Sequence, residues 1–568
     1  MHVHIVPNRG SAPTALLRES YREGGKVKKR TLANLSDLPM DQIEAIRAVL
    51  RGDALAPAGQ AFEIARSQAH GHVQAVMTAI KRLGLAAVLA SQPSRERDLV
   101  VAMLAARVLE PRTKLATVRW WGNTTLAEEA GVADAQEDDL YAAMDWLLER
   151  QDKIQKKLAA RHLQQGAMAL YDLSSSYYEG SSCPLAKRGY SRDRKKGTLQ
   201  VNYGLLTDVR GCPVAISVYE GDVADPLTLG PQIERLKGEY AIDQFVMVAD
   251  RGMISQKAVD TLKAENGVEW ITALKSVSIR ALVEQGQLQL DLFDERNLFE
   301  LTAPDYPGER LIACRNPQLA RLRAHKREDL LASTEDSLAK IKARVEAGRL
   351  SGQDKIALAV GRIVNQYKVA KHLVLDIKPD AFAYRRDEGK IAAEAALDGV
   401  YVIRTCLAQE RLSGPDCVRS YKALARVERA FRTLKSVDLQ IRPIHHRLAD
   451  RVRAHLFLCM LSYYVEWHMR QAWAPLLFAD EDQDAKLTRD PVAPAKRSPA
   501  ALRKVHTRHL EDGSAVHSFS TLLAQLATIT KNTCRAAAAG QAAPTFQVLT
   551  TPNPKQIQAL ELIDAIRP

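Results

Sequence analysis

The sequence lacks the features of a secreted, disulfide-bonded or membrane-spanning protein. Its seven cysteines are scattered, odd in number and without a Cys-x-x-Cys pair, which argues against a disulfide framework and against a zinc ribbon. The longest apolar stretch, residues 456–465, is too short to span a bilayer. Residues 1–10 lack the apolar segment of a secretory signal. We therefore expect a protein of a reducing cytoplasm with no membrane partner.

Motifs of several common enzyme classes are also missing. The chain has no Gly-x4-Gly-Lys-Ser/Thr and no Gly-x-Gly-x-x-Gly, the glycine-rich loops that hold the phosphates of nucleotides. It has neither the His-Glu-x-x-His of zinc proteases nor the Gly-x-Ser-x-Gly of serine hydrolases. Any catalytic chemistry must therefore use other residues.

The composition is that of a folded, basic protein with several domains. The chain has 568 residues, of which 46% are apolar and 26% charged, close to the averages of globular proteins. Lysine and arginine number 80 against 67 acidic residues, a formal net charge of +13. An excess of positive charge favours a polyanionic partner such as nucleic acid.

Hydrophobic periodicity divides the chain into four parts. After a short strand-like opening, helical spacing over 72–90 and 139–163 predicts a mostly helical N-terminal domain, 1–165. Strand-like runs then predict an α/β sheet domain built from 166–275 and 398–475, with an insertion domain, 276–397, between them. The remainder, 476–568, reads as a linker and helical tail. The predicted strands cover 167–175, 199–208, 214–221, 244–250, 268–274 and 398–405, with helices over 226–240, 255–266, 413–437 and 448–473.

Two aspartates follow apolar strand runs in the sheet domain. Asp172 ends MALYD and Asp250 ends FVMVAD, so both are predicted at the carboxyl ends of strands, where α/β sheets bind ligands. An aspartate at a strand end can equally form a turn or cap a helix. Two in the same context favour a site.

The predicted helix 413–437 supplies a third carboxylate, Glu428. A face of charged residues on a helix can be merely solvated, but apolar residues interleaved with this one suggest that the helix packs on the sheet with Glu428 at its edge. Two aspartates and a glutamate without histidine or cysteine suit Mg²⁺ or Mn²⁺ rather than zinc. Such cations can activate water or a 3′-hydroxyl against a phosphodiester. The residues of this face are Tyr421, Glu428, Arg432 and Lys435, with Leu424, Val427 and Phe431 between them.

The spacing Tyr421-x6-Glu428-x6-Lys435 resembles the Tyr-x2-Arg-x3-Glu-x6-Lys signature of DDE-class insertion-sequence transposases, particularly the insertion-sequence-4-like group and its 1634-type relatives. YDLSSSYYEG around the first aspartate and VADRGM around the second extend the likeness over roughly 165–475. The resemblance implies a ribonuclease-H-like α/β catalytic domain interrupted by an insertion domain before the last catalytic helix.

The same resemblance implies roles for individual residues. Asp172, Asp250 and Glu428 would be the metal-binding catalytic triad, while Tyr421 and Lys435 would contact DNA near the scissile phosphate. Leu424 stands where the signature has arginine, so that contact would be lost or come from Arg426 or Arg432, and both are predicted to bind DNA.

Basic residues gather around these motifs. Residues 419–453 hold ten lysines and arginines against three acids, which would attract phosphates. The loop 187–197 is a second basic run that could follow a DNA backbone or be only a solvated loop. Its predicted DNA contacts are Lys187, Arg188, Arg192, Arg194, Lys195 and Lys196.

The sequence therefore predicts a bacterial transposase, cytoplasmic and associated with the nucleoid. It would bind the terminal inverted repeats of its element, cleave double-stranded DNA with Mg²⁺ and join the ends to target DNA. A homodimer is expected in the active complex, with the N-terminal domain reading the ends by family analogy. The alternatives are a stand-alone metal-dependent nuclease of the same fold and a catalytically inactive, transposase-derived DNA-binding protein. Neither the end sequence nor the target preference follows from the sequence.

Overall fold

The computed structural model describes residues 1–8, 12–53, 62–193, 195, 197–482, 484, 488–536 and 544–567. Arg194 and Lys196, two predicted DNA contacts, lie outside this set. The chain forms two compact units. One unit contains 1–71, 123–125 and 527–552, and the other contains 72–122, 126–526 and 553–568. No helix among the described residues is both long and apolar enough to cross a bilayer.

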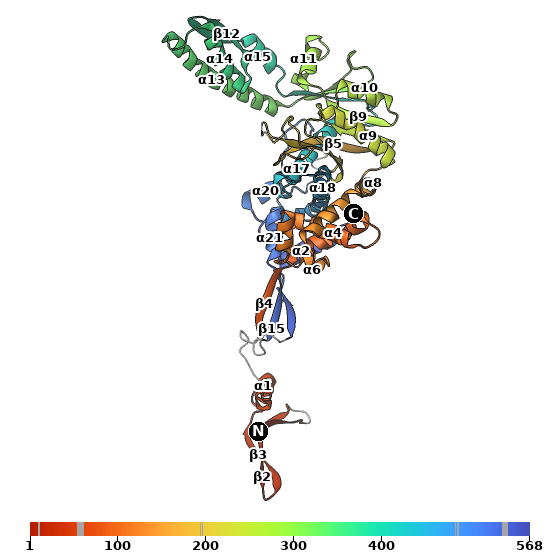
Figure 1. The fold of residues 1–568 in the computed structure, drawn as a ribbon, viewed down its shortest axis with the longest axis vertical. Coiled ribbons are helices and arrows are strands. Elements are labelled where there is room, and N and C mark those ends of the chain that lie inside the picture. The colour runs from red at the N-terminus through yellow and green to blue at the C-terminus, as the bar shows by residue number, and fades with distance from the viewer. Residues whose placement is uncertain are drawn as a thin grey trace. The chain divides into compact units, whose positions relative to one another are not determined.

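The first unit consists mainly of two small antiparallel sheets (Figure 1). Val3, Ala15 and Ile43 form a small core between one sheet and helix α1. The other sheet joins a strand near the N-terminus to two strands near the C-terminus. The elements are β1 (His2–Val6), β2 (Thr14–Glu23), β3 (Lys26–Asn34) and α1 (Met40–Arg51), then β4 (Phe62–Ala69), β15 (Thr530–Ala536) and β16 (Thr545–Leu549).

These strands correct two expectations about the ends of the chain. Within the part expected to be mostly helical, 1–165, the described residues before Gly71 form four strands and the helix α1, and the tail expected over 476–568 contains two strands as well as helices. Every residue of β3 and of β16 is exposed. Strands without a buried face lack the alternation of apolar and polar residues by which a strand is detected in a sequence.

The second unit begins with a group of helices that packs around α18 (Ala449–Ala472). α18 and α4 (Arg95–Leu109) are buried along most of their length, on all sides, as expected for helices at the centre of a core. α7 packs against both of them. The other helices of this group are α2 (Gly71–Arg82), α3 (Leu85–Leu89), α5 (Lys114–Trp121), α6 (Leu126–Glu129), α7 (Glu137–Leu148) and α8 (Gln151–His162).

An eight-stranded mixed sheet forms the centre of the second unit, in the order β10-β11-β14-β9-β8-β5-β6-β7. β5, β6 and β7 form an antiparallel meander, whereas β8 and β9 run parallel to β5. The expected α/β architecture is therefore confirmed. The strands are β5 (Ala167–Tyr177), β6 (Gln200–Asp208), β7 (Pro213–Glu220), β8 (Phe245–Ala249), β9 (Val268–Ala273), β10 (Leu298–Leu301), β11 (Arg310–Arg315) and β14 (Val400–Thr405), with helices α9 (Leu229–Glu234) and α10 (Gln256–Ala264) between strands.

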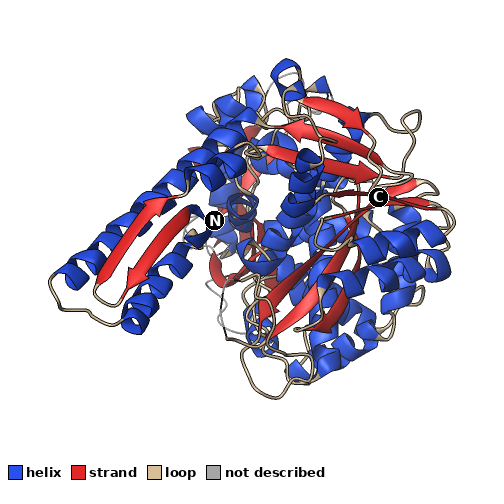
Figure 2. Ribbon diagram, turned by 90° about the horizontal axis from the view of Figure 1, so that it is seen from above, coloured by secondary structure: helices blue, strands red, loops and turns tan. Residues whose placement is uncertain are grey.

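The insertion is shorter than the expected 276–397, because β10 and β11 belong to the main sheet. The segment between β11 and β14, 316–399, forms an arm with its own apolar core. In this arm a two-stranded hairpin packs against long helices (Figure 2). The arm contains α13 (Pro317–Glu346), α14 (Gln353–Tyr367), β12 (Leu373–Lys378), β13 (Ala381–Arg386) and α15 (Glu388–Ala395), while α11 (Ser276–Glu284) and α12 (Leu292–Glu295) precede β10.

The helix expected over 413–437 is divided into α16 (Gly414–Lys422), α17 (Leu424–Arg432) and a π-helical turn, Thr433–Val437. Leu424, Val427 and Phe431 form the buried face of α17, and α17 packs against β5. The helices after α18 are α20 (Pro499–Thr507), α21 (Phe519–Ala527) and α22 (Pro554–Asp564).

Candidate active site

Asp172 and Asp250 are neighbours across the pair of parallel strands β5 and β8. Tyr171 lies opposite Ala249 in this pair, and the two aspartates are the next residue of each chain segment. Residues at equal register in a parallel pair point to the same face. The two carboxyl groups therefore start from adjacent positions. Asp250 directly follows the end of β8, as predicted. Asp172 does not lie at the carboxyl end of its strand, because β5 continues to Tyr177.

The environment of Asp172 links all three predicted catalytic acids. The pKa of Asp172 is raised to about 7, mainly by burial and also by the negative charges of Asp250 and Glu428. The Leu173 N–H, which donates to Asp172 Oδ1 at 2.8 Å, and the Arg192 guanidinium oppose this rise. The structure thus brings the three acids into one electrostatic environment, in which Asp172 exchanges its proton near neutral pH.

Tyr421 holds the second aspartate. Its hydroxyl donates to Asp250 Oδ1 at 2.9 Å, across 171 positions of sequence. Burial and the Asp250 charge raise the pKa of the Tyr421 phenol, so it stays protonated and remains a donor. Tyr421 orients the Asp250 carboxylate and leaves its other oxygen, Oδ2, free of this bond.

Glu428 reaches the site from α17. The apolar face of this helix packs against β5, and Phe431 meets Tyr203 of β6 with ring centroids 5.8 Å apart. Glu428 itself is exposed. The helix is fixed by its apolar residues, and the charge of its one acidic side chain acts on Asp172.

Arg192 and Asp225 form an ion pair beside the triad. Arg192 Nη2 lies 2.5 Å from Asp225 Oδ1. A Cβ atom built on Gly252 would lie 3.8 Å from Asp250 Oδ2 and 3.9 Å from Asp225 Oδ2, so a larger side chain at this position would contact both carboxylates. Sequence reasoning did not identify Asp225; its signal was an Asp-Pro pair at the start of a helical turn, Asp225–Thr228, which resembles an ordinary helix start.

Lys435 is engaged inside the protein. Its ammonium lies 3.0 Å from Asp193 Oδ1, and Arg442 binds the same oxygen at 2.5 Å. The other oxygen of Asp193 accepts from the Tyr177 N–H at 3.1 Å. Burial lowers the pKa of Lys435, and Asp193 partly offsets this. Lys435 would have to leave Asp193 to reach a phosphate.

The other predicted DNA contacts that the structure describes lie on the surface. The Arg426 guanidinium donates to the Val209 carbonyl, and its side chain is therefore directed to the β6–β7 turn. The Lys195 ammonium lies 3.4 Å from the centroid of the Tyr177 ring. The remaining exposed residues of this set are Lys187, Arg188 and Arg432. Their contacts with DNA stay predictions.

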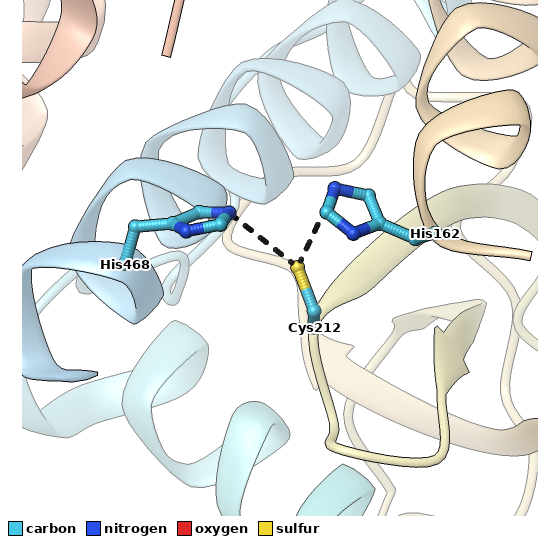
Figure 3. Close-up of side chains that lie close together, drawn as sticks. All are labelled: His162, Cys212 and His468. Carbon is cyan, nitrogen blue, oxygen red and sulfur yellow. Dashed lines mark hydrogen bonds between the residues drawn. The ribbon is translucent and has the colours of Figure 1, made fainter. Parts of the chain in front are cut away.

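A separate group of side chains, His162, Cys212 and His468, has the donor atoms of a metal site (Figure 3). Cys212 Sγ lies 4.0 Å from His162 Nε2 and 3.8 Å from His468 Nε2. Both ring nitrogens of His162 have other partners, because Nδ1 lies 3.2 Å from Arg210 Nη2 and Nε2 lies 3.0 Å from the Tyr464 hydroxyl. Arginine can only donate, so the proton of neutral His162 lies on Nε2. In this arrangement neither ring nitrogen of His162 has a free lone pair. His162 therefore could not bind a metal ion together with the Cys212 sulfur.

Comparison with known families assigns the two main parts of the sequence. The transposase DDE domain matches residues 175–465, and the N-terminal domain of IS1634 family transposases matches residues 3–60. No curated protein matches the chain. A solved piggyBac transposase synaptic complex with hairpin DNA aligns with 80% of this chain and 77% of that chain, at 9% identity and a TM-score of 0.32, which is too low to support an argument. The DDE domain covers more than half of the sequence, and the chain therefore belongs to the DDE-class transposases of insertion sequences, of the IS1634 type.

Proposed function

We propose that this transposase cleaves the ends of its element by metal-dependent hydrolysis and joins the 3′-hydroxyls to target DNA, with Asp172, Asp250 and Glu428 as the metal-binding acids. The observation that carries the proposal is the environment of Asp172, in which two other carboxylates from distant segments raise the pKa of one buried acid. Three acids so arranged repel one another without a cation.

The donor set fits the divalent cation that a DDE domain implies. Asp172, Asp250 and Glu428 offer carboxylate oxygens, which are the ligands of Mg²⁺ and Mn²⁺. When bound, such cations would stabilise charge on the attacking and leaving oxygens of a phosphodiester. Ligands must be deprotonated to bind. Because the pKa of Asp172 is raised to about 7, we expect metal affinity to fall as the pH falls below neutrality.

The residues around the acids would position them and the DNA. Tyr421 fixes the Asp250 carboxylate through its 2.9 Å hydrogen bond. Arg192, beside Asp172 and paired with Asp225, would place positive charge next to the scissile phosphate. Arg432 is exposed on the helix of Glu428, whereas Arg426 is bonded to the Val209 carbonyl. Arg432 is therefore the better candidate to replace the arginine that Leu424 displaces.

A ribonuclease-H-like catalytic domain is the finer description of the fold that we infer. The antiparallel meander β5-β6-β7 followed by β8 and β9, both parallel to β5, supports it. The acids then come from the first strand, from the end of the fourth and from a helix that follows the insertion. This arrangement leaves the arm, 316–399, between the fifth strand of the catalytic core and the last acid.

The test is cleavage of end DNA by Asp172→Asn and Glu428→Gln, with Glu410→Gln, an exposed glutamate outside the site, as the matched control. Both site variants keep the shape of the side chain but remove a charged ligand oxygen, whereas the control removes a charge outside the site. We expect cleavage to be lost in the first two variants and retained in the control, with binding to end DNA intact in all three. Cleavage at the wild-type rate in Mg²⁺ by either site variant would exclude the metal role.

A pre-cut end supplied with a target plasmid separates the rival functions. Joined product is expected from the wild-type protein, whereas a stand-alone nuclease would give none. An inactive DNA-binding descendant would neither cut nor join. We further propose that the N-terminal region reads the terminal repeats and that two copies hold the paired ends. Molecular mass in solution with and without paired end DNA tests the dimer.

A further inference from the structure

A basic cavity lies where the arm joins the catalytic sheet, and none of the three acids lines it. Its volume is about 400 Å³. The walls come from α11, from α13, from the helical turn Ala370–His372, from α15 and from the start of β14. All of these elements belong to the second unit.

Positive charge dominates the lining. Six lysines and arginines face two acids, Glu394 and Asp398, which leaves an excess of four positive charges. The two acids are already paired: Asp398 with Arg327 at 2.6 Å, and Glu394 with Lys371. The other four cations are exposed and form no ion pair with any residue that the structure describes. They are Arg280, Arg323, Lys326 and Lys368.

The arrangement differs from an ordinary solvated helix face. Arg323, Lys326 and Arg327 follow one another at i, i+3 and i+4 on α13 and so share one side of the helix. Across the cavity, Arg280 on α11 and Lys368 at the end of α14 contribute cations from separate elements. Like charges gathered around a concave surface repel one another, and an anion bound between them would relieve that repulsion.

A buried histidine provides a second, independent observation. His372 is only 3% exposed and lines the cavity. Its Nε2 lies 3.1 Å from Glu394 Oε2, and its Nδ1 is buried without a hydrogen-bond partner. Buried polar atoms are rarely left without a partner. A group bound beside this ring would supply the partner that Nδ1 lacks.

We propose that this cavity binds phosphate groups of the DNA backbone, as a second DNA contact that does not include the metal-binding acids. Arginine forks and lysine ammonium groups are the usual partners of phosphate oxygens. DNA is the polyanion that an insertion-sequence transposase handles. The proposal rests on that family membership and not on the identity of the catalytic triad.

The test compares two double variants with the same change of charge. Arg323→Gln with Lys326→Gln removes two cations of the cavity, and Lys340→Gln with Lys355→Gln removes two exposed lysines of the same arm outside it. The measurement is the slope of log K against log salt concentration for end DNA. Each lost phosphate contact lowers that slope by about 0.9 on duplex DNA. We expect the cavity variant to lose about 1.8 and the control variant to keep the wild-type slope, with equal melting temperatures.

Equal slopes for the two variants would overturn the proposal. A second arm titrates the wild-type protein with inorganic phosphate and with a nucleoside monophosphate, in the presence and absence of DNA. Competition by DNA supports the backbone as the source of the phosphate. Tight binding of the mononucleotide that DNA does not displace would overturn it in favour of a free nucleotide. Loss of cleavage by Asp172→Asn is independent of either result, so failure here and failure of the catalytic proposal can be told apart.

Discussion

Replacing Asp172 by asparagine should stabilise the metal-free protein at alkaline pH, although it should abolish cleavage. Burial raises the pKa of Asp172 from 3.8 to about 7, so the folded protein binds this proton more tightly than the unfolded chain does. Such a group contributes its full stability below pH 3.8 and loses it as the pH rises toward 7. Asparagine does not ionise, so the variant does not lose this stability as the pH rises.

The size of the effect follows from the two pKa values. By linkage, the cost of ionised Asp172 is about 0.6 kcal/mol at pH 4, about 2 kcal/mol at pH 5.5 and about 4 kcal/mol at pH 8.5. For a chain of this length the unfolding entropy is roughly 1 kcal/mol per kelvin, so the largest of these values corresponds to about 3 to 4 °C in melting temperature. The assay is thermal unfolding of both proteins in a chelator at the three pH values.

Adding Mg²⁺ or Mn²⁺ should reverse the ranking at pH 8.5. The cation binds ionised Asp172 and stabilises only the folded wild-type protein, whereas Asp172→Asn has lost one charged ligand. A constant difference between the two proteins at all three pH values would show a packing effect, not a charge effect. A metal-free variant less stable than wild type at pH 8.5 would refute the reasoning, because the carboxylate would then be favourably ionised in the fold.

Three further substitutions probe other features. Lys114→Met should stabilise the protein by at most about 4 to 5 kcal/mol at pH 6 and not at all above pH 10.5, since burial lowers the pKa of this lysine to about 7; urea unfolding at both pH values checks it. Gly252→Ala should leave the melting temperature unchanged but weaken Mn²⁺ binding, measured by electron paramagnetic resonance, because its methyl would lie between Asp225 and Asp250. Lys435→Ala should lower the melting temperature, because Asp193 would keep only Arg442 as an ion-pair partner. A salt slope reduced by about 0.9 would show in addition that Lys435 reaches a phosphate.

The sequence predicted those parts of the fold in which buried strands carry long apolar runs. β5 and β8 were readable because MALY and FVMVA precede an aspartate, and this placed two of the three acids on the correct elements. β3 was not readable, since none of its residues is buried. β10 and β11 are short strands that extend the main sheet beyond β14, although they precede β14 in the sequence by many residues. Their place in this sheet follows from the strands with which they pair and not from their hydrophobic periodicity.

The surroundings of the acids could not be predicted for a different reason. Lys435 carries a charge typical of a DNA contact, but its partner Asp193 lies 242 positions away. The pattern of basic residues in loop 187–197 did not indicate that the Asp193 side chain is buried, nor that Arg192 lies beside Asp172. Which charge faces solvent and which is paired depends on tertiary contacts that a local pattern does not encode.

The arm between β11 and β14 begins and ends at the same place in the sheet. Arg315 is the last residue of β11, and it pairs directly with Val400, the first residue of β14. As far as the sheet is concerned, residues 316–399 thus replace an ordinary hairpin turn, whose usual length is about two residues. The arm also carries its own apolar core, so exchanging it for a tight turn, or for an arm of another size, would preserve strand register. The sheet can therefore accept insertions of different size between β11 and β14 without a change in the catalytic domain.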